Sequence, residues 1–344
     1  MQGFRTKKNI KKQFQFSPTS LYKLIMTQAT HLLNPPKATR EALHQALFDF
    51  SNEESLIVLS ADLKKPTKVD KFAEKFPHKY IECGIAEANM VGISAGLAQG
   101  GYQPICSSFA SFLTGRYDII RVSIAYQNVP VILVGTHSGL AIGKDGVTQM
   151  GLEDISLMRG LPNMVVINPS TFNQTLSILK KLIKNKRSNP FYLRLGRQPV
   201  QEYYEEENIN YEKGFCTIGS GHDICLCSSG CVLDEVIKAQ EHLKDKGINA
   251  QIIDIFKIEK SLGDELQNCL KKHKFVITIE DHMSIGGLGS YICDGVLDNN
   301  LPLKVQKIAV KNVFPQSGSP NLLYSRYGIN SENIVNTSLE LLKQ

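Results

Sequence analysis

The segment YIECGIAEANMVGISAGLAQGG, residues 80–101, joins a short apolar run to a longer run of small residues. The first part reads as a strand, and the second has the apolar spacing of a helix. An acid, Glu87, stands where that helix would begin. One explanation is an exposed first-turn carboxylate that the helix dipole stabilises. The neighbouring small residues permit close packing and instead place this end of the helix in a crowded interior or interface, which leaves a buried carboxylate to be explained.

The same strand-then-helix pattern recurs along the chain. Helical spacings such as TFNQTLSILKKLIKNKR (171–187) separate strand-like runs at 55–62, 79–84, 103–109, 129–137, 164–169 and 190–196. This alternation predicts a mostly parallel sheet covered by helices on both sides. A second, shorter series of strand-like runs lies at 223–230, 249–256, 274–281 and 304–310. The sequence therefore predicts an α/β protein with two domains, each a mostly parallel sheet flanked by helices.

The polar segment QEYYEEENINYEKG interrupts the pattern and marks the boundary between the two domains. We expect a first domain over residues 37–200, a linker over 201–214 and a second domain over 215–344. Residues 1–36 form an N-terminal extension with the basic run RTKKNIKK (5–12), a possible amphipathic helix within 20–33 and a break at Pro35 and Pro36. A length of 344 residues suits two cores of ordinary size.

The charge and hydropathy pattern excludes several classes of protein. The 39 basic and 33 acidic residues give a net charge of +6, and much of the excess lies in the basic run at one end. No apolar run approaches the ~20 residues that span a bilayer, and the extension lacks the apolar core of a secretory signal. We expect a cytoplasmic protein that binds neither membranes nor nucleic acid.

The eight cysteines raise the question of a metal site or disulfides, most of all in CLCSSGC at 225–231. Cys225 and Cys227 belong to a run typical of a buried parallel strand, and neither a histidine nor a second cysteine pair follows at zinc-site spacing. Free cysteines behave as small core side chains, and a protein that is not exported keeps them reduced. We expect no metal site there.

Three blocks resemble the pyrimidine-binding domain of transketolases in order and spacing: ECGIAEANMVGISAGLA, CSSFASFLTGRYDIIR and GTHSGLAIGKDGVTQMGLEDISLMRGLPN, within residues 82–163. The later segments RLGRQPV and FVITIEDHMSIGGLGS extend the resemblance through most of the chain. It implies a thiamine-diphosphate pyrimidine-binding fold followed by a transketolase C-terminal-like domain. Residues 1–36 resemble no family that we identify.

The resemblance implies a catalytic and cofactor-binding role for Glu87, as the acid that hydrogen-bonds N1′ of the aminopyrimidine of thiamine diphosphate. Its proton would help the ring to remove the thiazolium C2 proton, and burial favours the protonated form of a carboxyl. Phe109 and Phe112, spaced i and i+3, would share one face of a helix over 109–127. Such a pair could simply belong to the apolar face of a helix that packs in the core. The resemblance instead implies that Phe112 stacks on the pyrimidine, with Phe109 beside it. Gly115 stands where some relatives have a third aromatic residue.

The resemblance also implies substrate-binding residues. His137 ends an apolar strand, and it would reach the sugar substrate together with Asp145 and Gln149, with a catalytic part for the histidine. Gln149 stands where one branch of transketolases has histidine. Arg197 would bind the substrate phosphate, with Arg194 as the alternative. Asp62, after the first strand, matches a family carboxylate near the cofactor.

Complete transketolases begin with a diphosphate-binding domain that has a Gly-Asp-Gly segment and, further on, asparagines that hold Mg²⁺ and the diphosphate. Neither CDGVLDNN (293–300), expected within a helix, nor KDG (144–146) has that spacing. The chain thus resembles the C-terminal section of a split transketolase. The resemblance implies a partner chain that holds most of the Mg²⁺ and diphosphate contacts. It also implies self-dimerisation, supported by the second domain, into a heterotetramer of two heterodimers.

The expected function is therefore transfer of a two-carbon ketol unit from a ketose phosphate to an aldose acceptor in carbohydrate metabolism. Two alternatives stay open. The beta subunit of a 2-oxo acid dehydrogenase shares this layout, although the 135–163 block is closer to transketolases. A noncatalytic scaffold of the same fold would need none of Glu87, Phe112, His137, Asp145 and Arg197. The sequence does not name the donor and acceptor sugars.

Overall fold

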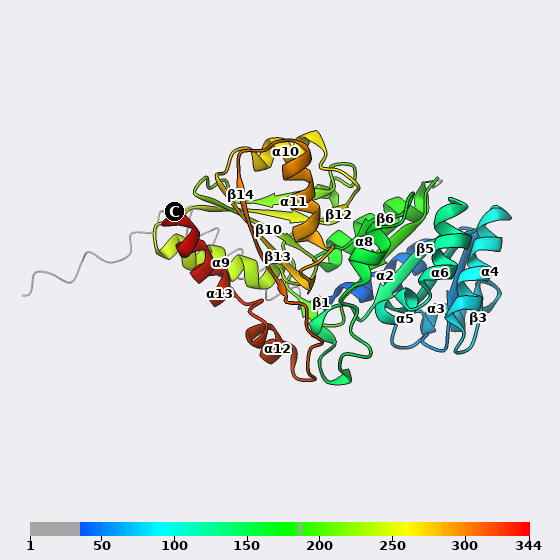
Figure 1. Ribbon diagram of the computed structural model, residues 1–344. Helices are drawn as coiled ribbons and strands as arrows, with labels where there is room; N and C mark the ends of the chain where they lie inside the picture. The colour runs from blue at the N-terminus through cyan, green and yellow to red at the C-terminus, as the bar shows by residue number, and fades with distance from the viewer. Residues whose placement is uncertain (1–34, 186–187) are drawn as a thin grey trace, which may run out of the picture. The chain divides into compact units, whose positions relative to one another are not determined.

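The computed structural model describes residues 35–185 and 188–344, and Lys37–Gln344 form one compact unit (Figure 1). The basic run at 5–12 and the helix predicted within 20–33 lie outside the described residues. Among the helices that the structure describes, none has both the length and the apolar character needed to cross a bilayer.

The first sheet has seven strands, six of them parallel. Its order is β12 (Lys257–Ile258), β6 (Val165–Ile167), β7 (Phe191–Arg194), β5 (Ile132–Thr136), β4 (Gln103–Phe109), β2 (Leu56–Ser60) and β3 (Tyr80–Glu82). The β5 segment is buried along its whole length, as expected for a central parallel strand with helices on both faces. All six strands predicted in this part of the sequence are confirmed.

Helices cover both faces of this sheet. On one face α2 (Thr39–Asp49) packs against α8 (Phe172–Lys184), whose N-cap Thr171 accepts a hydrogen bond from the Gln174 amide. The other face carries α4 (Glu87–Gln99), α7 (Asp154–Arg159) and the segment after β4. Shorter elements complete this half: α3 (Asp70–Lys75), the 3₁₀ turns η1 (Pro77–Lys79), η3 (Leu140–Asp145) and η4 (Glu206–Asn208), and the pair β1 (Lys37–Ala38) with β8 (Pro199–Val200).

The second sheet has five strands in the order β14 (Lys304–Val310), β13 (Phe275–Met283), β10 (Ile224–Ser229), β11 (Ala250–Ile255) and β9 (Phe215–Ile218). Four strands are parallel, and β9 is antiparallel at the edge. On one face α9 (Leu233–Asp245) packs against α13 (Ser331–Leu342), and on the other lie α10 (Asp264–Leu270) and α11 (Leu288–Asp298). The helix α12 (Pro320–Arg326) follows β14. The predicted α/β fold with two mostly parallel sheets is confirmed.

Local predictions in the second half can also be compared with the structure. Cys225 and Cys227 lie in the buried strand β10 as free thiols, in agreement with the strand prediction. Residues 293–298 lie in α11, so the expected helix at CDGVLDNN is confirmed for this part. The sequence analysis missed β9 and β12. The strand β12 follows the predicted domain boundary at 201–214 in the sequence, yet it pairs with β6 of the first sheet.

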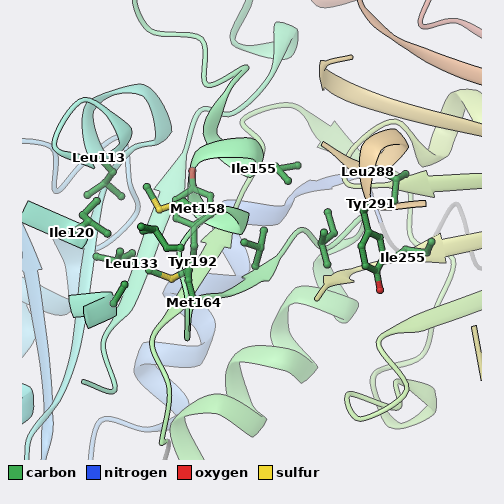
Figure 2. Close-up of a cluster of buried hydrophobic side chains, with 14 of the residues drawn as sticks. Leu113, Ile120, Leu133, Ile155, Met158, Met164, Tyr192, Ile255, Leu288 and Tyr291 are labelled. Atoms are coloured by element: carbon green, nitrogen blue, oxygen red, sulfur yellow. The ribbon is translucent and has the colours of Figure 1, made fainter. Parts of the chain in front are cut away.

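A continuous apolar cluster joins the two sheets (Figure 2). Tyr192 of β7 lies between Met158 and Met164 in the first half, and Ile255, Leu288 and Tyr291 extend the cluster into the second. These side chains are nearly or fully buried. Because burial of apolar area is the main stabilising contribution to folding, the two halves stabilise each other across this cluster.

The segment 109–127 is not one helix, contrary to the expectation from its spacing. It forms α5 (Ala110–Thr114), α6 (Tyr117–Ile119) and the π-helical turn η2 (Ile120–Tyr126). Gly115 and Arg116 separate the first two helices, and glycine is a weak helix former. Phe109 therefore ends strand β4 instead of starting a helix.

Candidate active site

The predicted site residues follow the carboxyl ends of neighbouring parallel strands. In this sheet the ends of β3, β2, β4, β5 and β7 meet at one edge, where open α/β sheets bind ligands. The residues at or just after those ends are Glu87, Asp62, Phe109, His137 and Arg197. The strand order thus explains why residues spread over more than a hundred positions of the sequence gather at one edge.

Glu87 is the first residue of α4 and is only 6% exposed. Its carboxylate lies 4.0 Å from the guanidinium of Arg116, which stands between α5 and α6. Within the described part of the chain, no hydrogen bond to the Glu87 carboxylate is formed. A buried carboxyl without a hydrogen-bond partner is rare in a folded protein and is suited to a ligand that can supply one.

Two phenylalanines lie where strand β4 leads into helix α5. The rings of Phe109 and Phe112 stack with centroids 5.2 Å apart and an interplanar angle of 21°. Phe109 is buried, whereas Phe112 in α5 is half-buried and can offer its face to a ligand. The helical spacing predicted that the two rings lie on one face of a helix. The rings do lie side by side, but Phe109 belongs to the end of β4 and Phe112 belongs to α5.

His137 lies directly after β5 in the left-handed region, with φ of 57°. Such a conformation in a residue other than glycine costs free energy and is frequent at functional sites. Its ring stacks on Phe109 with centroids 3.8 Å apart. The histidine is 3% exposed, so the fold holds the imidazole in one place beside the two phenylalanines.

The hydrogen bonds of His137 define its tautomer. Arg40 Nη1 is 2.9 Å from Nε2, and because an arginine only donates, Nε2 accepts. The Thr136 hydroxyl donates to the Ser108 carbonyl, so it accepts from Nδ1–H at 2.9 Å. Burial, followed by the positive charges of Arg40 and Arg197, lowers the pKa of His137 to about 3. The ring is therefore neutral at neutral pH.

Arg40 is a site residue that the sequence analysis missed. It lies in the first turn of α2, and its Nη1 also donates to the Pro66 carbonyl at 2.9 Å. Its Nε is buried without a hydrogen-bond partner among the described residues. Burial and the nearby charge of Arg197 lower the pKa of Arg40. Two guanidinium groups that repel each other make a site that an anion would stabilise.

Arg197 and Asp145 form the exposed side of the same cluster. Arg197 Nη1 donates to Asp145 Oδ2 at 2.7 Å and to the Ile142 carbonyl at 3.3 Å. Arg197 is 43% exposed, so it is open to a ligand. Arg194, the alternative phosphate ligand, is instead enclosed and bonded to Asp154 Oδ2 at 2.8 Å. Of these two arginines, only Arg197 is placed to meet a substrate.

Two predicted residues are not joined to this cluster by a hydrogen bond or an ion pair within the described chain. The Gln149 carbonyl accepts from Ser111 at 3.1 Å, while its side chain makes no hydrogen bond or ion pair with described residues. Asp62 is exposed with φ of 58°, and its amide donates to Glu82 Oε1 at 2.8 Å. Glu82 also accepts from Tyr80 and from the Gly84 amide, which makes Asp62 part of a loop next to β3.

The arrangement fits the pyrimidine half of a thiamine cofactor. Glu87 provides a nearly buried carboxyl that makes no hydrogen bond within the described chain, and Phe112 in α5 provides a half-buried aromatic ring. By contrast, the part of the chain that the structure describes has no group of three or more His, Cys, Asp or Glu residues that could hold a metal ion. The residues present suit a heteroaromatic ring and an anion.

Comparisons with known proteins show the family to which the chain belongs. Residues 36–202 match the family described as "Transketolase, pyrimidine binding domain", and residues 217–334 match "Transketolase, C-terminal domain". A chain from Methanocaldococcus jannaschii that is named, provisionally, a transketolase C-terminal section is 36% identical over 90% of this chain and 97% of its own length. One of the subunits of the apulose-4-phosphate transketolase of Phocaeicola vulgatus is 28% identical over 89% of this chain and 98% of its own.

Among solved structures, "Split gene transketolase, inactive beta4 tetramer" superposes with a TM-score of 0.80 at 35% identity. The superposition covers 89% of this chain and 98% of that chain. The transketolase family depends on thiamine diphosphate, the cofactor whose pyrimidine half the site fits. The chain therefore belongs to the transketolase family, in which it corresponds to the C-terminal section with its pyrimidine-binding and C-terminal domains.

Proposed function

We propose that this chain is the part of a thiamine-diphosphate-dependent transketolase that binds the cofactor pyrimidine and part of the substrate. The enzyme transfers a two-carbon ketol unit from a ketose phosphate to an aldose acceptor. The observation that carries the proposal is the cluster of Arg40, His137, Arg197 and Asp145 beside the ring of Phe109. It combines an anion site with a neutral imidazole next to the aromatic face expected for the pyrimidine.

Each residue has a role that follows from its surroundings. Glu87 hydrogen-bonds N1′ of the pyrimidine, because its nearly buried carboxyl makes no hydrogen bond within the described chain. Phe112 stacks on that ring. The cofactor, when bound, supplies the cleavage and formation of the carbon–carbon bond. His137, neutral and held by Thr136, orients a hydroxyl of the sugar, and Asp62 faces the cofactor from the end of β2.

The phosphate of the sugar would be bound by Arg40 and Arg197. Arg197 is partly exposed, and Arg40 has an unpartnered Nε among the described residues, so both have donors for a dianion. Asp145, bonded to Arg197, holds that guanidinium in place, and Gln149 extends the polar wall toward the sugar. Asp145 pairs with Arg197 but no ion pair is formed by Arg40 within the described chain, so a neutral substrate would leave the Arg40 charge uncompensated, which favours phosphorylated sugars.

We further propose that a second chain binds the diphosphate and Mg²⁺ and docks beside Glu87. Large apolar side chains are exposed just before α4 and on η2, which packs against α4: Ile85 at 84%, Val122 at 51% and Tyr126 at 79%. On α4, Gly92 and Gly96 face open space, so this helix packs closely only on its other side within the chain. An exposed apolar surface of this kind is typical of subunit interfaces. The same surface suits a heterotetramer, in which two copies of this chain meet two partner chains.

Reconstitution tests the proposal. The purified chain is mixed with a candidate partner that has the Gly-Asp-Gly and asparagine pattern, together with thiamine diphosphate and Mg²⁺. Ketol transfer between a ketose phosphate and an aldose phosphate is then followed. We expect turnover only in the mixture. Robust turnover by this chain alone would refute the need for a partner, and oxidative decarboxylation of 2-oxo acids without ketol transfer would favour a dehydrogenase subunit.

A further inference from the structure

The second domain contacts the loop that carries Asp145. In this loop the Leu140 amide donates to Asp281 Oδ1 at 2.7 Å, across the domain junction. The helix α12 packs against the same turn. Gly139, with φ of 75°, lies so close to the Asp281 carboxylate that a Cβ on Gly139 would overlap it. The path of the loop is thus fixed by a residue of the other domain.

The same carboxylate is also tied to the segment that carries Arg197. The Tyr324 hydroxyl of α12 donates to Asp281 Oδ2 at 2.9 Å. That hydroxyl in turn accepts from Gln198 Nε2 at 3.0 Å, and Gln198 follows Arg197 in the chain. A chain of hydrogen bonds therefore runs from Gln198 through Tyr324 and Asp281 to Leu140.

These two residues of the second domain are deeply buried. Asp281 is 4% exposed and Tyr324 is 5% exposed. Arg194 is enclosed next to them, and its Nη2 donates to the Asp281 carbonyl at 2.8 Å and to the Gly151 carbonyl at 3.0 Å. In such a dry environment a hydrogen bond holds its partners firmly, and removal of one member leaves the others unsatisfied.

We propose that Asp281 and Tyr324 are positioning residues, through which the second domain sets the distance between Arg197 and Asp145 for binding of the substrate phosphate. The inference rests on the proposed function for the identity of the ligand. In this proposal the second domain contributes to substrate affinity as well as to the association of subunits. Both act indirectly: Asp281 holds the Leu140 amide of the loop at 139–146, and Tyr324 holds the side chain of Gln198, the neighbour of Arg197.

Tyr324→Phe tests this proposal, with Tyr291→Phe as the matched control. Tyr291 is also buried in the second domain, and its hydroxyl donates to the Ser261 carbonyl at 3.2 Å. In the reconstituted complex, we expect Tyr324→Phe to raise KM for a phosphorylated ketose roughly tenfold while kcat changes less than about twofold. KM for an unphosphorylated ketose should change much less. The control should leave the ratio of the two KM values as in the wild type.

A second measurement does not depend on activity. Amide hydrogen exchange of the full chain should become faster at 139–146 and 195–198 in Tyr324→Phe, and unchanged there in Tyr291→Phe. If ketol transfer is intact but neither exchange nor the KM ratio changes, the positioning role is wrong while the proposed function stands. If the complex has no ketol transfer, the proposed function is wrong, and the exchange result alone decides whether Tyr324 holds the loop.

Discussion

Glu87 shows how a single side chain links burial to chemistry. It is 6% exposed at the start of α4, and within the described chain its carboxylate makes an ion pair with Arg116 at 4.0 Å and no hydrogen bond. A structural carboxylate would be paired more closely, because an unpaired buried charge is costly. The proposed ligand, a ring nitrogen that accepts its proton in a hydrogen bond, accounts for the otherwise missing partner.

Glu87→Gln tests this assignment in the reconstituted complex. Glutamine keeps the size and can still donate a hydrogen bond, but it cannot transfer a proton. We expect exchange of the cofactor C2 proton and ketol transfer to fall by a factor of about 10² or more, as is usual for loss of an acid–base group. Assembly with the partner should persist. Wild-type rates of C2 exchange in this variant would contradict the role of Glu87, and NMR in D₂O measures them.

At the residue scale, sequence motifs indicated some of the candidate site residues but not all of them. His137, Asp145 and Arg197 follow strand ends within long family-like blocks, and the structure places them around one cluster. Arg40 was missed, because it stands 97 positions before His137 in a segment that reads as an ordinary amphipathic helix. The break at Pro35 and Pro36 before this segment was visible in the sequence. A contact between segments that are distant in the sequence depends on the strand order, however, and the spacing of residues within one segment does not reveal it.

Among the elements, strands with strong apolar patterns were predictable, and short edge strands were not. The strand β12 has only two residues and pairs across the domain junction, so no local periodicity could indicate it. The segment 109–127 has helical spacing throughout, yet it breaks at Gly115. Its apolar residues pack against α4 and the sheet, and that packing, which is nonlocal, decides where the turns lie.

The helix α4 carries a prediction at this scale. Gly96 is exposed and a Cβ there would meet nothing, so Gly96→Gln should fold and should stabilise the isolated chain by up to about 1 kcal/mol through better helix propensity. If the small-residue face of α4 contacts another subunit, the longer side chain should weaken assembly at least tenfold. Sedimentation velocity of the chain with and without its partner measures this.

Gly263→Gln is the matched control. Gly263 precedes α10, and a Cβ there also meets nothing within 4 Å. It lies in the second half of the chain, as the N-cap of α10 beside the second sheet, and not on α4. Unchanged assembly is expected for this variant. Equal assembly of Gly96→Gln and the wild type would exclude this face of α4 from the interface.

At the scale of the whole molecule, the two halves depend on a polar contact as well as on the apolar cluster. Asp254 of β11 is fully buried and accepts hydrogen bonds from Ser170 at 2.5 Å, Gln174 at 3.0 Å and Tyr204 at 3.0 Å. The first two come from the other half of the chain. The sequence indicated two domains with a boundary at 201–214, and that boundary stays a prediction, since Tyr204 within it joins both halves.

Asp254 makes the stability of this junction depend on pH. Burial raises its pKa from 3.8 to about 6, against the lowering effect of the hydrogen bonds. The folded state therefore binds this proton more tightly than the unfolded chain. The stabilisation is complete below about pH 3.8 and is lost as the pH rises through 6. The difference corresponds to roughly 3 kcal/mol in the free energy of unfolding.

Asp254→Asn should remove this contribution. As the pH rises from 4 to 6.5, we expect the unfolding temperature of the variant to fall less than that of the wild type. The comparison concerns this change with pH and not the unfolding temperature at any single pH. Ser170→Ala should do the opposite, because loss of a hydrogen bond to the carboxylate raises the Asp254 pKa further and steepens the decline. Scanning calorimetry across this range measures both variants. Parallel curves for the wild type and the two variants would show that Asp254 does not titrate in this range and would contradict the proposed pH dependence of the junction.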